Sequence, residues 1–281
     1  MAYVFETMHQ RTQKIGEAKV SAVLNEHPPS GFLKPDTHGS SPLRIVGVHG
    51  HDPLHNHILH ALPKNDYQRL LGHLEFIAMP QGMVLCEANS HLQNVYFPTS
   101  GIVSLMHETA DGLSAEIAAI GREGMLGVSV CMGSTNNLSR AIVTSAGFGF
   151  SLNVKLLSEE FEKGTALQNV LLHYLQALMM QISQDAVCQR HHCVFQQLCR
   201  WLLLTLDRLP DNEIVATQSM IATLLGVRRE SIAESASRLQ QQGLIQYARG
   251  HLKVLDRTGL ENHACECYAA IKNNLQHYLE M

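Results

Sequence analysis

The sequence predicts an α+β protein in which a small β-roll precedes one long helix and a C-terminal group of short helices with a β-hairpin. Three observations support this order. Between residues 76 and 157, short apolar segments alternate with turn signals such as PTSG, TADG and MGSTNN, a texture typical of small β-rolls and barrels. After Gly164, nearly thirty residues follow without proline or glycine. Helical periodicity then continues almost to the end of the chain.

The bulk composition indicates a globular protein of the cytoplasm. The 281 residues are 45% hydrophobic and 16% charged, with a formal net charge of −4. The opening segment MAYVFETMHQRTQK lacks the apolar core of a signal peptide, and no apolar stretch approaches the roughly 20 residues of a membrane span. The first of the seven cysteines is Cys86. An odd number of cysteines in such a chain favours reduced thiols over a disulfide framework.

Further helices are expected on both sides of the β-rich region. Residues 1–53 are rich in Pro, Gly, Ser and His, and we expect a largely disordered extension there. The segment NHILHALPKNDYQRLLGHLE has helical spacing, and Pro63 should divide it into two short helices. After the β-rich region, SEEFEK offers Ser158 as a helix start, and a final helix is expected from about Leu260.

The long segment after Gly164 should form a helix with one dominant seam. Seam positions recur at alternating spacings of four and three residues, and Leu175 and Ile182 widen the stripe. The length of this seam favours a dimer interface over a further core helix within one chain. The predicted dimer contacts are Leu167, Leu171, Tyr174, Leu178, Gln181 and Asp185.

The segment TQSMIATLLGVRRESIAESASRLQQQG has the pattern of a helix-turn-helix. Thr217 is a good N-cap for a short helix, and Gly226 permits a tight turn after it. The second helix should bury Ile232, Ala236 and Leu239, and the hairpin after it supplies a wing. Residues 228–257 carry six Lys/Arg against three acids, a charge of +3 that suits a DNA contact surface. A structural three-helix bundle with solvated charges is the alternative.

The order β-roll, long helix and winged helix-turn-helix resembles the cyclic-AMP receptor protein and fumarate-nitrate reduction regulator (Crp/Fnr) superfamily of bacterial transcription regulators. The motifs that carry the resemblance are NVYFPTSGIVSL, IGREGMLG, QRHHCVFQQLCRWLL, MIATLLGVRRESI and GLIQYARGHLKVLD. The resemblance implies a homodimer that binds an inverted-repeat operator in double-stranded DNA and contacts RNA polymerase, and not an enzyme or a membrane protein. It divides the chain into an extension (1–53), a cyclic-nucleotide-binding-like β-roll (54–163), a dimerisation helix (164–192) and a winged helix-turn-helix domain with a C-terminal helix (193–281).

The resemblance also assigns base reading to the start of the recognition helix. An Arg-Glu pair there reads a G·C pair and its neighbour in the family, and Arg229 and Glu230 match it. An arginine can fork onto guanine O6 and N7, and a glutamate can accept from cytosine N4. Glu234 stands where members commonly have another arginine, so the familiar operator is not implied. The predicted DNA contacts are Thr217, Gln218, Ser219, Arg228, Arg229, Glu230, Ser231, Glu234, Arg249 and Lys253.

The glycine loop IGREGMLG matches the part of the roll that holds phosphate and ribose in cyclic-nucleotide-binding relatives. Those relatives have a ribose-binding Glu soon after the last glycine and an Arg-Ser/Thr-Ala sequence for the phosphate. Here Val128 follows the glycine, and Arg140 follows Ser139. We therefore do not expect cyclic AMP, although a true cyclic-nucleotide-responsive regulator stays an alternative. Arg122 and Glu123 should lie on an exposed turn and pair locally or at the domain interface. The residues of a possible effector pocket are Gly121, Gly124, Gly127, Ser139 and Arg140.

Metal or haem sensing is a further alternative, for which the sequence offers only weak candidates. Five imidazoles fall within twelve residues, namely His49, His51, His55, His57 and His60, but nothing fixes their geometry. We therefore predict no metal site and no cofactor. Nucleophile-elbow, Walker and metalloprotease motifs are also missing from the sequence, which argues against an enzyme.

The cysteines of the C-terminal half look equally unpromising as ligands. Cys188, Cys193 and Cys199 are spaced by five and six residues, which suits small buried thiols better than a shared site on one helix face. Cys265 and Cys267 could bind a metal with His263, but the final helix should splay them apart. His191 and His192 match the hinge before the DNA-binding domain and are expected to pack or to form hydrogen bonds there.

Overall fold

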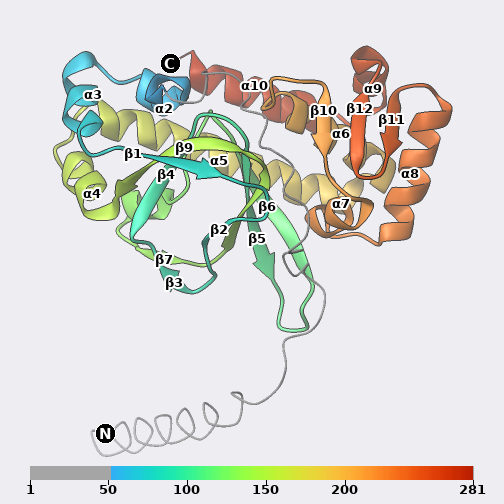
Figure 1. Ribbon diagram of the computed structural model, residues 1–281, viewed down its shortest axis with the longest axis horizontal. Helices are drawn as coiled ribbons and strands as arrows, with labels where there is room; N and C mark the ends of the chain where they lie inside the picture. The colour runs from blue at the N-terminus through green and yellow to red at the C-terminus, as the bar shows by residue number, and fades with distance from the viewer. Residues whose placement is uncertain (1–51, 281) are drawn as a thin grey trace, which may run out of the picture. The chain divides into compact units, whose positions relative to one another are not determined.

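Two antiparallel sheets form a β-roll in the computed structural model, which describes residues 52–280 (Figure 1). One sheet has the strand order β1-β9-β4 and the other β2-β8-β5-β6, while β3 pairs with β7. The strands are β1 (Glu75–Met79), β2 (Val84–Cys86), β3 (Ser90–His91), β4 (Asn94–Pro98), β5 (Ile102–Glu108), β6 (Ser114–Ile120), β7 (Asn136–Asn137), β8 (Arg140–Ser145) and β9 (Gly147–Asn153). Val95 and Phe97, alternate residues of β4, are fully buried in a core that includes residues of the helices before and after the roll. The β-roll predicted from the turn-punctuated segments is confirmed.

Short helices precede the roll. They are η1 (Pro53–His55), α2 (His57–His60) and α3 (Lys64–Leu71). Pro63 separates α2 from α3, as predicted. The buried amide of Asn56 donates to Pro98 O (2.9 Å) and Gly124 O (2.8 Å), so it fastens the start of α2 to the roll. Apart from its last two residues, the extension predicted over residues 1–53 lies outside the described residues.

Two helices follow the roll, and the first begins earlier than predicted. Helix α4 (Val154–Glu162) starts before Ser158, because the side chain of Asn153 caps it by accepting a hydrogen bond from a backbone N–H of the first turn (3.0 Å). Gly164 has a φ of +67°, which suits glycine, and it separates α4 from α5 (Ala166–His191). The 26 residues of α5 confirm the long helix.

The C-terminal part combines six elements of the helix-turn-helix region with two closing helices. They are α6 (Val194–Leu206), β10 (Glu213–Val215), α7 (Gln218–Leu225), α8 (Arg229–Gln241), β11 (Ile245–Ala248), β12 (His251–Val254), α9 (Arg257–His263) and α10 (Cys267–Leu279). The strands form one antiparallel sheet in the order β10-β12-β11. The single final helix predicted from Leu260 is wrong: the backbone is extended at Ala264, and this break separates α9 from α10.

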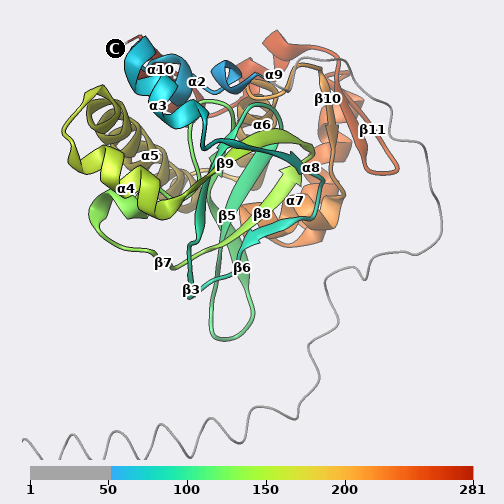
Figure 2. The same cartoon turned by 60° about the vertical axis from the view of Figure 1, so that its left-hand side comes forward.

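Helix α10 returns to α5 and packs along it (Figures 1 and 2). The ring of Tyr278 lies 5.9 Å from that of Tyr174, and Asn274 Nδ2 donates to Ala177 O (3.2 Å). The C-terminal helix therefore belongs to the packing of the long helix and not only to that of the helix-turn-helix. None of the helices formed by residues 52–280 combines the length and the apolar character that crossing a membrane requires.

Candidate nucleic-acid interface

The helix-turn-helix forms as its sequence indicates. The hydroxyl of Thr217 accepts a hydrogen bond from Met220 N (3.1 Å) and caps α7. Gly226 adopts a left-handed φ of +64° at the end of α7, a conformation that glycine tolerates without a Cβ clash. The buried face of α8 consists of Ile232, Ser235, Ala236 and Leu239. Its apolar members Ile232, Ala236 and Leu239 pack in the same core as α6 and α7, which leaves the opposite face of α8 to solvent.

The side chains at the start of α8 lie on this opposite face. Arg228, Arg229, Glu230 and Glu234 are exposed, and Ser231 is half-buried. Within residues 52–280, none of these five side chains takes part in an ion pair. Free N–H groups and a positive partial charge also lie at the start of a helix, where they favour an anionic ligand. The start of α8 is therefore a polar, accessible surface, and its charged side chains form no ion pair within the described residues.

An open hollow of about 230 Å³ lies beside this turn, between α7, α8 and the β11–β12 hairpin. It brings together five of the predicted DNA contacts, namely Thr217, Gln218, Ser219, Arg229 and Arg249. Tyr247 also lines the hollow, and its hydroxyl donates to Ala216 O (2.7 Å), which ties the hairpin to the start of α7. Arg249 and Gly250 have φ values of +50° and +81° and form the two-residue turn of the hairpin.

Lys253 differs from the other predicted contacts. It lies on β12 opposite β10, where its ammonium group is 3.4 Å from Glu213 Oε1, and both side chains are exposed. Lys253 does not line the hollow. Among the wing cations, Arg249 is therefore the one that shares the hollow with the recognition helix.

The seam predicted for dimerisation faces the protein's own interior. Leu167, Leu171, Tyr174, Leu178 and Gln181 are all buried within one chain, and Tyr174 Oη donates to Met125 O of the roll (3.1 Å). Asp185 is half-buried and pairs with Arg200 of α6. The prediction that this seam meets a partner is therefore wrong. The large apolar side chains of α5 that remain exposed lie on the other side of the helix, among exposed polar residues, and are Leu172, Met179, Met180, Ile182 and Val187.

The glycines of the IGREGMLG loop make room for protein atoms. A Cβ at Gly124 would lie 2.4 Å from the ring of Tyr174, and one at Gly121 would lie 2.6 Å from Glu123 Oε2. Gly127 has a φ of +99°, and a Cβ there would meet Val95 at 2.8 Å. The loop is thus closely packed at each of its three glycines, against the Glu123–Arg208 pair, Tyr174 of α5 and Val95 of the roll. The other two predicted pocket residues lie at the start of β8, where Ser139 is buried and Arg140 Nε is 3.2 Å from Glu87 Oε2.

Glu123 corrects the expectation of an exposed turn. Arg122 is exposed, but Glu123 is buried, and its Oε1 accepts from Arg208 Nε at 2.7 Å. Burial opposes ionisation of this carboxyl, but the charge of Arg208 and the hydrogen bonds from Arg208 and the loop backbone outweigh burial and lower the pKa of Glu123. Arg208 follows α6, so this pair connects the loop of the roll to the segment that leads into the winged domain. Of the two residues, Glu123 pairs with a residue far along the chain, and only Arg122 has the expected exposure.

The metal-binding candidates also need correction. His55 and His60 are exposed and His57 is half-buried, while His49 and His51 lie outside the described residues. His263 packs against Phe195, with ring centroids 5.6 Å apart.

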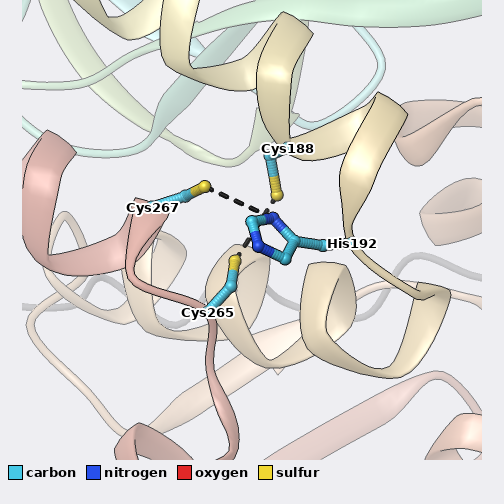
Figure 3. Close-up of side chains that lie close together, drawn as sticks. All are labelled: Cys188, His192, Cys265 and Cys267. Carbon is cyan, nitrogen blue, oxygen red and sulfur yellow. Dashed lines mark hydrogen bonds between the residues drawn. The ribbon is translucent and has the colours of Figure 1, made fainter.

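By contrast, Cys188, His192, Cys265 and Cys267 come together, with their ligand atoms all within 4.8 Å of one another (Figure 3). The sequence contained a usable signal, because Cys188 and His192 are four residues apart and therefore share a helix face. The prediction that the last helix splays Cys265 and Cys267 is wrong, because Cys265 precedes α10 and only Cys267 belongs to it.

Comparison with known proteins agrees with this architecture. Residues 196–263 match the family model described as the Crp-like helix-turn-helix domain. No curated protein matches the chain at a significant level.

Among solved structures, a candidate transcriptional regulator of the Crp/Fnr family from Eubacterium rectale is similar over 75% of this chain and 97% of its own, with a TM-score of 0.60 and 16% identity. FixK2 from Bradyrhizobium japonicum is similar over 68% and 98%, with a TM-score of 0.57 and 14% identity. The c-di-GMP responsive regulator CLP from Xanthomonas campestris is similar over 68% and 99%, with a TM-score of 0.53 and 16% identity. These likenesses establish the fold, and the domain match covers α7, α8 and the wing.

Proposed function

We propose that this chain, a Crp/Fnr-type transcription regulator with a DNA-binding helix-turn-helix, acts as a homodimer on an inverted-repeat operator and answers to a signal other than cyclic AMP. The observation that carries the proposal is the hollow shared by α7, α8 and the wing. It gathers the first turn of α7, Arg229 and Arg249 on one accessible surface. Cations and free helix N–H groups on one face fit the spaced phosphates of a duplex.

In this proposal, α8 enters the major groove and its first turn reads the bases. Arg229 and Glu230 are exposed there and free of ion pairs within residues 52–280, so neither has to break an internal contact to reach a base edge. Thr217, Gln218 and Ser219 at the start of α7, together with Arg249 in the wing, hold the phosphates and fix the register. Glu234 remains a candidate for a further base contact one turn along.

The exposed apolar side chains of α5 support the dimer. Three apolar side chains of this helix are exposed to solvent: Met179 is 61% exposed, Val187 50% and Leu172 46%. Pairing of two such helices would remove these side chains from water, a gain of roughly 25 cal/mol for each Å² of apolar surface. A two-fold dimer carries two copies of α8, which then meet half-sites about one helical turn, ~34 Å, apart.

The β-roll is the proposed sensor, and RNA polymerase is the proposed partner at the promoter. The glycine loop packs on Tyr174 of α5, and Glu123 pairs with Arg208 directly after α6. A conformational change of the loop would therefore alter its contacts with α5 and with the end of α6. The space above its glycines is filled by protein side chains, which argues against a phosphate in that position. The Xanthomonas campestris neighbour is described as c-di-GMP responsive. This description supports the idea that the fold serves signals other than cyclic AMP.

Selection from a random duplex library at fixed salt tests the proposal. The purified full chain should enrich an inverted repeat whose half-sites are about one turn apart. Calorimetry with cyclic AMP should give no heat, and the nucleotide should leave operator affinity unchanged. A library without any enriched sequence, or one enriched for a single isolated half-site, contradicts the operator proposal. Micromolar binding of cyclic AMP contradicts the proposed class of signal.

A further inference from the structure

A cluster of three thiols and one imidazole joins the end of α5 to the linker between α9 and α10. Cys188 lies in the last turn of α5, and His192 ends that helix. Cys265 and Cys267 stand on either side of Glu266, before and at the first residue of α10. Figure 3 shows the four side chains pointing toward one another from these two segments.

The distances within the cluster suit one metal ion. All four ligand atoms lie within 4.8 Å of one another, with Cys188 Sγ 3.5 Å from Cys265 Sγ and Cys267 Sγ 3.5 Å from His192 Nδ1. In tetrahedral coordination with zinc–sulfur bonds of about 2.3 Å, two sulfurs lie about 3.8 Å apart. The side chains therefore need to move little to surround one ion. An iron–sulfur cluster of several irons would hold its ligands further apart.

The three thiols are also set apart from the apolar cores of the described residues. Cys188, Cys265 and Cys267 form a small buried cluster of their own, separate from the three larger hydrophobic clusters. Zinc binds thiolates and a neutral imidazole in this ratio at structural sites, where the four protein ligands leave no open position.

Neighbouring residues orient the ligands as they do at metal centres. His192 turns Nδ1 toward the thiols, while its Nε2 lies 3.3 Å from Glu266 Oε1, a carboxylate that can hold the other ring N–H. Gln184 Nε2 donates to Cys267 Sγ (3.0 Å), which suits a thiolate acceptor.

The charge around the cluster is also suitable. Three thiolates and one Zn²⁺ leave a net charge of −1 at the site. The guanidinium of Arg200 is buried, and it interacts electrostatically with both Cys265 and Cys267. Its Nε has no hydrogen-bond partner among the described atoms. Arg200 also pairs with Asp185, so part of its positive charge is balanced within the chain and the remainder faces the thiols.

We propose that Cys188, His192, Cys265 and Cys267 bind one Zn²⁺ ion, which fastens the start of α10 to the end of α5. Binding replaces the three thiol protons by metal–sulfur bonds and releases those protons to solvent. The site has no open coordination position, so its role is structural. The ligands lie at the end of α5 and between α9 and α10, so none of them belongs to the exposed face of α8 on which the DNA-binding proposal rests.

Metal analysis of the full chain, purified under reducing conditions without chelator, tests the site. The wild type should hold one zinc per chain, and Cys265→Ser should lose it. Cys193→Ser is the matched control, because Cys193 is exposed, adjoins His192 and caps α6 with a side-chain contact that serine can also make. This control should keep the zinc. Equal zinc in wild type and Cys265→Ser overturns the site and points to the N-terminal histidines or to adventitious metal.

A second measurement covers the case in which Cys265→Ser fails to fold. Glu266 is 79% exposed at its side chain, so Glu266→Gln should preserve the fold. Loss of the carboxylate behind a ligating histidine typically weakens metal binding 10- to 100-fold, and a chelator competition should detect that change. Replacement of zinc by Co²⁺ should give the thiolate-to-cobalt charge-transfer and tetrahedral absorption bands of a three-sulfur site. Absence of these bands, or isolation of a Cys188–Cys265 disulfide from the reduced preparation, overturns the proposal.

Discussion

Single residues decide how the roll is connected to the winged domain, and Glu123 is the clearest case. Its position in a glycine-rich loop suggested an exposed turn, yet the carboxylate is buried on Arg208, 85 residues further along the chain. No local pattern could reveal this partner, because the contact depends on how α6 packs against the roll. By contrast, the cap at Thr217 and the left-handed turn at Gly226 were predictable, since both interactions are made within the same helix terminus.

Removal of one member of this buried pair should be costly. Arg208→Met leaves the Glu123 carboxylate buried without its cation, and we expect the free energy of unfolding to fall by about 3–5 kcal/mol. Urea denaturation of wild type and variant at neutral pH measures the difference. The double variant Glu123→Leu/Arg208→Met should recover much of the loss, because it buries no charge. A double variant as unstable as Arg208→Met would contradict this explanation.

The same pair predicts a pH dependence. The pKa of Glu123 is lowered in the folded protein, so its stabilising effect is fully present above the ordinary value of 4.5 and is lost as the pH falls through the folded value. The stability difference between wild type and Arg208→Met should therefore shrink as the pH falls. Burial raises the pKa of Glu123 in the variant, and its protonation there removes the buried charge, while wild type loses the contribution of the pair below pH 4.5. Denaturation curves from pH 7 to pH 3 measure this difference. A difference that stays constant over that range would mean that the carboxylate is not the titrating partner.

Two arginines on the proposed DNA-binding surface should have separable roles. Arg229→Ala should cost ~1–3 kcal/mol per half-site and relax the preference at one base, since a forked contact to guanine is lost. Arg249→Ala should weaken all sequences alike and reduce the salt slope by about one, because it removes a phosphate contact.

A randomised half-site library at several salt concentrations measures both effects. Lys253→Ala is the matched control. The Lys253 cation pairs with Glu213 and does not line the hollow, so this variant should change the salt slope less than Arg249→Ala does. An unchanged base preference in Arg229→Ala would show that α8 does not read the sequence.

At the scale of elements, α5 shows what periodicity can and cannot predict. Its length and helical character followed from the absence of proline and glycine, and the buried seam followed from the spacing of its apolar residues. The spacing could not say whether a partner or the chain's own roll covers that seam. The helix in fact has apolar residues on two faces, and the roll with α10 covers the one with the stronger heptad pattern.

The two faces of α5 predict opposite outcomes for similar substitutions. Met179→Glu with Val187→Glu changes exposed residues only, so the chain should stay folded but become monomeric. Leu178→Glu places a charge in the core and should unfold the chain instead. Sedimentation equilibrium with circular dichroism distinguishes loss of dimer from loss of fold. A dimer that persists in the Met179/Val187 variant would exclude this face as the interface.

At the scale of the whole molecule, the thiol–imidazole cluster illustrates a limit of sequence-based prediction. The pairing of Cys188 with His192 follows from helix geometry, but Cys265 lies 77 residues beyond Cys188. Only the return of α10 to α5 brings the two segments together. The break at Ala264 matters equally, because a continuous final helix would have turned Cys265 and Cys267 away from each other. The tertiary arrangement therefore creates the site, and the sequence supplies its parts.

This location predicts that zinc supports both stability and DNA binding. His192 lies between the end of α5 and the start of α6. An ion that links His192 to the start of α10 therefore also restrains this α5–α6 connection, which precedes the winged helix-turn-helix. Free zinc at 100 times its Kd should raise the free energy of unfolding by about 2.7 kcal/mol over the metal-free chain. Thermal unfolding of chelator-treated and zinc-restored protein measures this term, and operator binding of the same samples measures the effect on this connection. Restored protein should bind the operator more tightly, and Glu266→Gln should need more zinc to reach the same affinity. Equal operator affinity with and without bound zinc, alongside a clear thermal shift, would show that the ion stabilises the attachment of α10 but does not affect DNA binding.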